Sequence, residues 1–190
     1  MRDSLQTLLG TAGYGCTIFA SGAEFLASDP GAARGCVLVD VRMPGMDGLE
    51  LQREMKARAI ALPVIFMTGF GEVPLAVEAM KAGAVDFVQK PSTLSVLKDC
   101  IDRALAIGAA SQQAAAEAAA ARERIERLTP RERDVLRLLV AGKPNKIIAY
   151  ELNISPRTVE IHRARVMDKM AVRSLSELVR VSLAAGGAEG

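Results

Sequence analysis

The chain has 190 residues, 50% of them hydrophobic and 24% charged, with a formal net charge of +2 and no Trp. This length allows one large domain or two small ones, and the absence of a long apolar run or a signal-peptide pattern predicts a cytoplasmic protein with no membrane partner. The three cysteines form no C-x-x-C pair, which argues against a disulfide framework and a zinc site.

The charge is unevenly distributed along the chain. Residues 1–121 hold 10 Lys/Arg and 13 Asp/Glu, a net charge of −3, whereas residues 122–190 hold 14 and 9, a net charge of +5. All five Phe lie in the first part. An acidic part followed by a basic part predicts two modules, the second with a polyanionic partner.

The first part alternates between strand and helix patterns. Short apolar stretches typical of strands cover residues 16–19, 36–39, 63–67 and 85–88. Patterns typical of helices cover residues 1–12, a segment capped by Ser21, residues 47–58 and residues 73–82. Because strands that alternate with helices form parallel sheets, we expect a doubly wound α/β domain with helices on both faces.

Three of these strands end in residues that carry chemistry. Asp40, Thr68 and Lys90 follow successive strands, and parallel strands bring their carboxyl ends to one edge of the sheet. Each residue alone is more often a loop cap or an exposed polar side chain. Together they predict a nucleophile beside two groups that can hold a phosphoryl oxygen.

The stretches V-L-V-D-V-R-M-P-G-M-D-G, F-M-T-G and A-V-D-F-V-Q-K-P resemble the receiver domain of bacterial response regulators. The resemblance implies that Asp40 is phosphorylated by a sensor histidine kinase, that Thr68 and Lys90 contact the phosphoryl group, and that Phe87 switches together with Thr68. It also implies a cis peptide bond before Pro91 and a Mg²⁺ ion bound by Asp40 and the backbone carbonyl of Arg42.

The chain departs from this family at its start. Receivers begin with a strand followed by an acidic pair that helps bind Mg²⁺, but the only acids before Asp40 are Asp3, Glu24 and Asp29, and none ends an apolar strand. The strand would lie between those expected at 16–19 and 36–39. We therefore expect an N-terminally truncated receiver, rather than a divergent one, in which Mg²⁺ binds poorly.

The second part reads as helical throughout. Residues 104–127 are rich in Ala, Glu, Gln and Arg and predict a helical linker that continues the last receiver helix. Thr129 and Glu132 form a capping box with Pro130 at the first helical position. The remaining helices are expected at 145–152 and 156–170, joined by a tight turn typical of a helix-turn-helix, although an ordinary αα-corner has the same pattern.

The last of these helices has a core face and an exposed face. Val159, Val166 and Met170 share the face expected in the core. Side chains on the other face would read bases: Arg157, Glu160, Ile161, Ala164 and Arg165. Further side chains would contact phosphates: Lys143, Lys146, Thr158, Arg163 and Lys169.

The blocks L-T-P-R-E-R-D-V-L, N-K-I-I-A-Y-E-L and S-P-R-T-V-E-I-H-R resemble the LuxR- and NarL-type output domain, and specifically the FixJ group. The resemblance divides the chain into a receiver at 1–107, a linker at 108–127 and a helix-turn-helix domain at 128–188. It implies a transcription activator that dimerises through residues 73–88 when phosphorylated, binds promoter DNA as a dimer and has RNA polymerase as a further partner.

Three hypotheses follow. The first is a phosphorylation-controlled DNA-binding regulator that is not an enzyme. The second is a DNA-binding regulator whose incomplete receiver acts without phosphorylation. The third is a hydrolase with Asp40 as nucleophile, which the sequence disfavours because position 42 is Arg and the single histidine, His162, lies in the other module.

Overall fold

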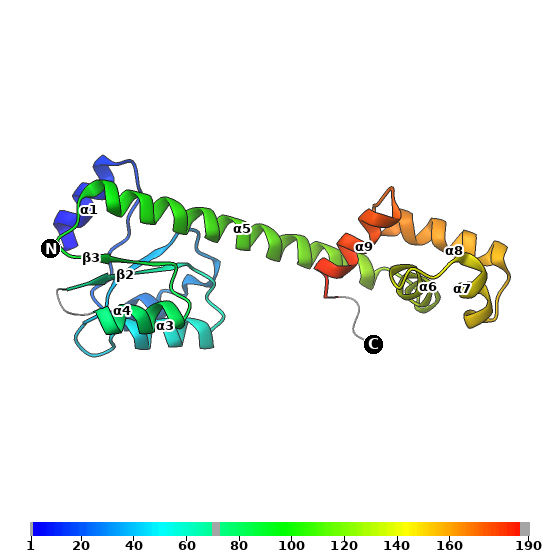
Figure 1. The fold of residues 1–190 in the computed structure, drawn as a ribbon, viewed down its shortest axis with the longest axis horizontal. Helices are drawn as coiled ribbons and strands as arrows, with labels where there is room; N and C mark the ends of the chain where they lie inside the picture. The colour runs from blue at the N-terminus through cyan, green and yellow to red at the C-terminus, as the bar shows by residue number, and fades with distance from the viewer. Residues whose placement is uncertain (1, 70–72, 187–190) are drawn as a thin grey trace. The chain divides into compact units, whose positions relative to one another are not determined.

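The computed structural model describes residues 2–69 and 73–186 (Figure 1). They fall into two compact units, an N-terminal unit of residues 1–111 and a C-terminal unit of residues 112–190. No helix in the described ranges combines the length and the apolarity that crossing a lipid bilayer requires.

The N-terminal unit contains a parallel sheet in the order β1-β2-β3. The strands are β1 (Val37–Asp40), β2 (Val64–Thr68) and β3 (Asp86–Gln89). Asp40 pairs with Met67, and Thr68 pairs with Gln89, so all three strands end at the same edge. The expected α/β class is confirmed.

Helices cover both faces of this sheet. They are α1 (Arg2–Thr11), α2 (Gly22–Ala27), a short 3₁₀ turn (Pro30–Ala32), α3 (Gly48–Ala57), α4 (Val73–Lys81) and the first part of α5 (Leu94–Glu126). Figure 1 shows α1 and α5 on one side of the sheet and α3 and α4 on the other. Ile65 and Phe66, adjacent on β2, are both fully buried in the two opposite cores, which is the alternation expected of a strand covered on both faces.

The strand expected at residues 16–19 is absent, and this prediction is wrong. The segment is irregular, although the ring of Phe19 packs edge-on against Phe25 with centroids 5.4 Å apart. In the described residues β1 pairs only with β2. Within this part of the chain, no further strand lies next to residues 16–19 to form backbone hydrogen bonds with them. Strand-forming residues adopt a strand only where a partner satisfies their backbone groups.

The C-terminal unit is helical. After the end of α5 it contains α6 (Pro130–Val140), α7 (Asn145–Leu152), α8 (Pro156–Lys169) and α9 (Leu175–Ala184). The capping box predicted at Thr129 is present, with both of its hydrogen bonds. Val159, Val166 and Met170 are fully buried, as their spacing predicts.

Helix α9 is not among the helices that the sequence predicts, although its start carries a local signal. Ser174 caps the helix by accepting a hydrogen bond from the backbone N–H of Glu177, and the Glu177 carboxylate accepts one from the N–H of Arg173. This serine and glutamate have the same three-residue spacing as Thr129 and Glu132. The signal was therefore available in the sequence.

Candidate functional site

Asp40 and Lys90 meet at the carboxyl edge of the sheet. The Lys90 ammonium donates to Oδ2 of Asp40, and the two side chains are 25% and 26% exposed, respectively. The backbone N–H of Arg42 donates to Oδ1 of Asp40 at 3.2 Å. Both carboxylate oxygens therefore have a donor, and solvent still reaches the pair.

Thr68 lies at the same edge and is buried, with 3% exposure. Its carbonyl accepts a hydrogen bond from the N–H of Lys90 at 2.8 Å, which joins the ends of β2 and β3. The peptide bond between Lys90 and Pro91 is cis, as the resemblance implies. The structure thus brings Asp40 and Lys90 into contact and places Thr68 on the neighbouring strand end.

Gly48, the first residue of α3, shapes the end of the loop after Asp40. A Cβ at this position would lie 2.5 Å from the carbonyl oxygen of Asp40 and 2.9 Å from Cε1 of Phe66. The N–H of Gly48 also donates to the carbonyl of Val41 at 3.0 Å. Only glycine allows this close approach between the start of α3 and the end of β1.

Exposed apolar side chains lie on α4 and β3. Val77 is 49% exposed, Met80 is 40% exposed and Phe87 is 43% exposed. These residues fall within the range expected to form a dimer face, whose first side chains, those of Val73 and Pro74, lie outside the described part.

The residues around Asp40 do not fit a Mg²⁺ ion. Mg²⁺ sites need oxygen ligands in near-octahedral geometry and usually include one or two carboxylates. Here the single carboxylate of Asp40 already binds an ammonium, and Asp47 caps α3 by accepting from the N–H of Glu50 at 2.7 Å. Within the described ranges no group of three or more His, Cys, Asp or Glu side chains could hold a metal.

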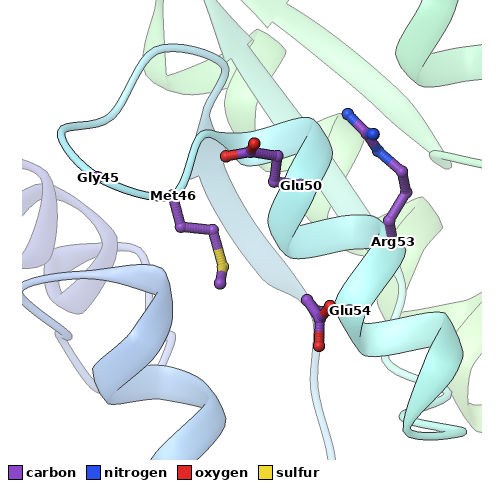
Figure 2. Close-up of a pocket in the computed structure, with 5 residues that line it drawn as sticks. All are labelled: Gly45, Met46, Glu50, Arg53 and Glu54. Carbon is purple, nitrogen blue, oxygen red and sulfur yellow. The ribbon is translucent and has the colours of Figure 1, made fainter.

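A surface hollow of about 490 Å³ lies apart from these residues (Figure 2). It is lined by Gly45, Met46, Glu50, Arg53 and Glu54. Figure 2 shows Met46 extending from the loop before α3, while the three charged side chains project from α3 itself. None of the strand-end residues lines this hollow, so it is not the candidate site.

In the C-terminal unit, α7 and α8 are joined by a tight turn. Asn153 adopts a left-handed conformation with φ 51°, and Ser155 caps α8 by accepting from the N–H of Thr158 at 3.0 Å. The face of α8 opposite the core is exposed, and Ile161 on it is 48% exposed. The side chains expected to read bases all lie on this exposed face: Arg157, Glu160, Ile161, Ala164 and Arg165.

The residues expected to contact phosphates differ in their surroundings. Lys146 is exposed, Lys143 lies 3.6 Å from the Glu151 carboxylate, and Arg163 donates to the side chain of Asn145 at 3.5 Å. Lys169 instead donates to the buried carboxylate of Glu132 at 2.6 Å. This geometry does not support a phosphate contact for Lys169, because its ammonium already neutralises a buried anion.

Two family models match the chain. Residues 1–102 match the response regulator receiver domain, and residues 126–182 match the bacterial regulatory proteins of the luxR family. The chain is 53% identical to the transcriptional regulatory protein FixJ of Bradyrhizobium diazoefficiens over 98% of its own length and 91% of that protein. It is 44% identical to the tetrathionate response regulatory protein TtrR of Salmonella typhimurium over 95% and 85% of the two chains.

Solved structures agree with these matches. The response regulator StyR is 39% identical, with a TM-score of 0.82 over 96% of this chain and 92% of that one. Full-length FixJ from B. japonicum is 50% identical, with a TM-score of 0.58 over 98% and 92% of the two chains. The order of the two modules and the high identity along nearly the whole chain lead to one assignment. The chain belongs to the FixJ group of two-component response regulators, in which a receiver domain precedes a LuxR-family DNA-binding domain.

Proposed function

We propose that Asp40 accepts a phosphoryl group from a sensor histidine kinase and that this modification controls the binding of the C-terminal unit to promoter DNA. The observation that supports it best is the contact between Asp40 and Lys90 at an edge that also carries Thr68. A nucleophilic carboxylate, a cation and a hydroxyl at one sheet edge are groups that can take part in phosphoryl transfer to an aspartate. The residues at this edge lie within the range that matches the receiver domain family.

The proposed transfer is a displacement at phosphorus. A carboxylate oxygen of Asp40 attacks the phosphoryl group of a phosphohistidine, the new O–P bond forms, and the P–N bond breaks so that the histidine leaves with the electron pair. Lys90 then neutralises charge on the phosphoryl oxygens from the position it already holds against Oδ2. Thr68 would donate its hydroxyl to another of these oxygens, and Phe87 would follow it in the switch.

The proposed DNA contact places α8 in the major groove. Its exposed residues would supply the base contacts: Arg157, Glu160, Ile161, Ala164 and Arg165. Lys143, Lys146, Thr158 and Arg163 would contact phosphates and fix the register. Binding as a dimer would use the exposed surface of Val77, Met80 and Phe87 in the receiver, and RNA polymerase is a further proposed partner in the cytoplasm.

The test compares DNA affinity with and without phosphorylation. The probe is a duplex that the purified full chain selects from a random-sequence library, and the phosphodonor is acetyl phosphate. We expect tighter binding after treatment in the wild-type chain and no change in an Asp40→Asn variant, which cannot form the acyl phosphate. Equal affinity of the treated and untreated chain would exclude control by phosphorylation, but it would not contradict DNA binding.

A second candidate is a regulator that binds DNA without phosphorylation. The observation that favours it is the poor fit of Mg²⁺ to the residues around Asp40, because divalent cations normally assist phosphoryl transfer. This candidate predicts that the chain incorporates no phosphate from acetyl phosphate, with or without added Mg²⁺, and still prefers its selected duplex. Stoichiometric phosphate incorporation that Asp40→Asn abolishes would contradict it.

A further inference from the structure

Two arginines of α5 bind the carboxyl ends of other helices in the C-terminal unit. Arg124 donates from Nη1 to the carbonyl of Met170 at 3.1 Å, and Arg122 donates from Nε to the carbonyl of Ala185 at 3.2 Å. Met170 and Ala185 are the residues that cap α8 and α9. The last carbonyls of a helix lack partners within it and form the negative end of its dipole, so a guanidinium stabilises them there.

The connection between α5 and α8 is reciprocal. Lys169, the last residue of α8, donates to the carbonyl of Arg127 at 3.3 Å, just beyond the end of α5, and to the Glu132 carboxylate of α6 at 2.6 Å. Arg133 of α6 donates to the carbonyl of Glu126 at 3.0 Å. The carboxyl ends of α5 and α8 are therefore each held by cations from a neighbouring helix.

The last turns of α5 also pack against the core of this unit. Ala121 and Leu128 are both 3% exposed, and Ile125 packs against the buried cluster that includes Val159 and Leu178. These residues lie in or beside the segment that the sequence predicts to be a linker. Their burial indicates that the end of α5 is a structural part of the C-terminal unit.

We propose that Arg124, supported by Arg122, is a positioning residue for DNA recognition, an inference that rests on the proposed binding of DNA by α8. The base-reading side chains lie between Arg157 and Arg165 on α8, and Arg124 holds the carboxyl end of the same helix. Hydrogen bonds to base edges require defined geometry, whereas attraction to phosphates tolerates small displacements. Arg124 therefore affects how well the protein discriminates between DNA sequences, although it does not contact the DNA.

The experiment uses the full-length chain with three substitutions. Arg124→Ala removes the contact, Arg124→Lys keeps a cationic donor, and Arg180→Ala is the control, since Arg180 is an exposed arginine of α9. Affinity is measured for a duplex that the wild-type chain selects from a random library and for an unrelated duplex of equal length. Each titration is repeated over a series of salt concentrations.

We expect Arg124→Ala to weaken binding to the selected duplex about tenfold and binding to the unrelated duplex less than about twofold. The slope of log affinity against log salt concentration stays unchanged, because no phosphate contact is lost. Arg124→Lys recovers part of the affinity, and Arg180→Ala behaves like the wild type.

Other outcomes would overturn the inference. Unchanged affinity of Arg124→Ala for the selected duplex excludes a positioning role, and an equal loss on both duplexes with a slope smaller by about one unit marks a phosphate contact instead. Should Arg124→Ala fold poorly, Arg124→Lys replaces it in the same titrations, with a smaller loss of affinity expected for the selected duplex and none for the unrelated duplex. Unchanged affinity of Arg124→Lys for the selected duplex would then exclude the proposal. A wild-type chain that selects no duplex would contradict the proposed function itself.

Discussion

Glu132 shows how one residue stabilises the DNA-binding unit. Its carboxylate is almost fully buried, with a side-chain exposure of 3%, and it accepts from the Lys169 ammonium at 2.6 Å and from the N–H of Thr129 at 2.9 Å. The hydrogen bond from Lys169, and to a smaller extent the hydrogen bond from the backbone N–H of Thr129, lowers the pKa of Glu132 from 4.5 to about 2. The charged form is therefore strongly favoured in the folded state.

This pKa predicts how the stability of the C-terminal unit depends on pH. The folded-state pKa lies below the unfolded value, so the stabilisation is complete above about pH 4.5 and is lost as the pH falls towards about 2. The loss amounts to roughly 3 kcal/mol. Glu132→Gln should lower the free energy of unfolding by about 3 kcal/mol at pH 7 and flatten this part of the pH profile.

The measurement is chemical unfolding followed by circular dichroism between pH 7 and pH 2.5, with the transition of the C-terminal unit analysed separately. Glu126→Gln is the matched control, because Glu126 is exposed and its substitution should leave the profile unchanged. Parallel profiles for Glu132→Gln and the wild type would contradict the prediction.

At the scale of the elements, local signals predict most helices and the central strands. Ser21 and Thr129 cap α2 and α6 as expected, because a capping serine or threonine acts within a few residues of chain. The strand expected at residues 16–19 fails because, in the described residues, no strand lies beside it to pair with. Strand propensity reports the fit to a sheet, which is a property of the tertiary structure.

The same distinction applies to the sites. The meeting of Asp40 and Lys90 follows from the rule that parallel strands end at one edge, so it was predictable although 50 residues separate them. No such rule predicts the contact of Lys169 with Glu132. From the sequence alone, this lysine is therefore expected to contact phosphates. Arginines in an alanine-rich segment likewise give no local sign that they bind the ends of other helices.

The exposed apolar surface of α4 and β3 makes a prediction about self-association. Met80→Asp places a carboxylate in the proposed dimer face, and burying an unpaired charge between two receivers is strongly unfavourable. We expect the dissociation constant of the phosphorylated dimer to rise at least about tenfold. Sedimentation equilibrium in acetyl phosphate measures it.

Glu78→Gln is the control for this experiment, because Glu78 is exposed on the same helix and the substitution adds no charge. Phosphate incorporation should be equal in Met80→Asp and the wild type, since Met80 is not one of the strand-end residues. An unchanged dissociation constant in Met80→Asp would assign dimerisation to another surface.

At the scale of the whole molecule, the two units are connected by a stretch of helix with little packing of its own. Residues 109–120 of α5 are mostly exposed and consist largely of Ala, whereas Gly108 and Ala121 at either side are buried. Alanine has the highest helix propensity, so this stretch remains helical without a core. A continuous helix is the covalent path by which a change in the receiver would reach the DNA-binding unit.

This arrangement predicts the effect of an insertion after Ala115. A flexible Gly-Gly-Ser-Gly insertion should keep DNA affinity within about twofold of the unphosphorylated wild type but remove the response to acetyl phosphate, because a flexible linker transmits no defined displacement. A helical insertion of the same length, Ala-Ala-Glu-Ala, should keep part of the response. Titration of the selected duplex with and without phosphodonor measures both, and a full response with the flexible insertion would show that helical continuity is dispensable.

The arginines of α5 also bear on how such regulators exchange modules. The luxR-family match begins at residue 126, yet Arg122 and Arg124, which bind the ends of α9 and α8, precede it. A DNA-binding module transferred to another regulator from residue 126 onwards would lack Arg122 and Arg124, so the receiving protein would have to supply the two cations. A module transferred from about residue 112 onwards would carry both arginines. For this chain we therefore expect an exchange of modules to be least disruptive within the alanine-rich stretch, several residues before the start of the luxR-family match.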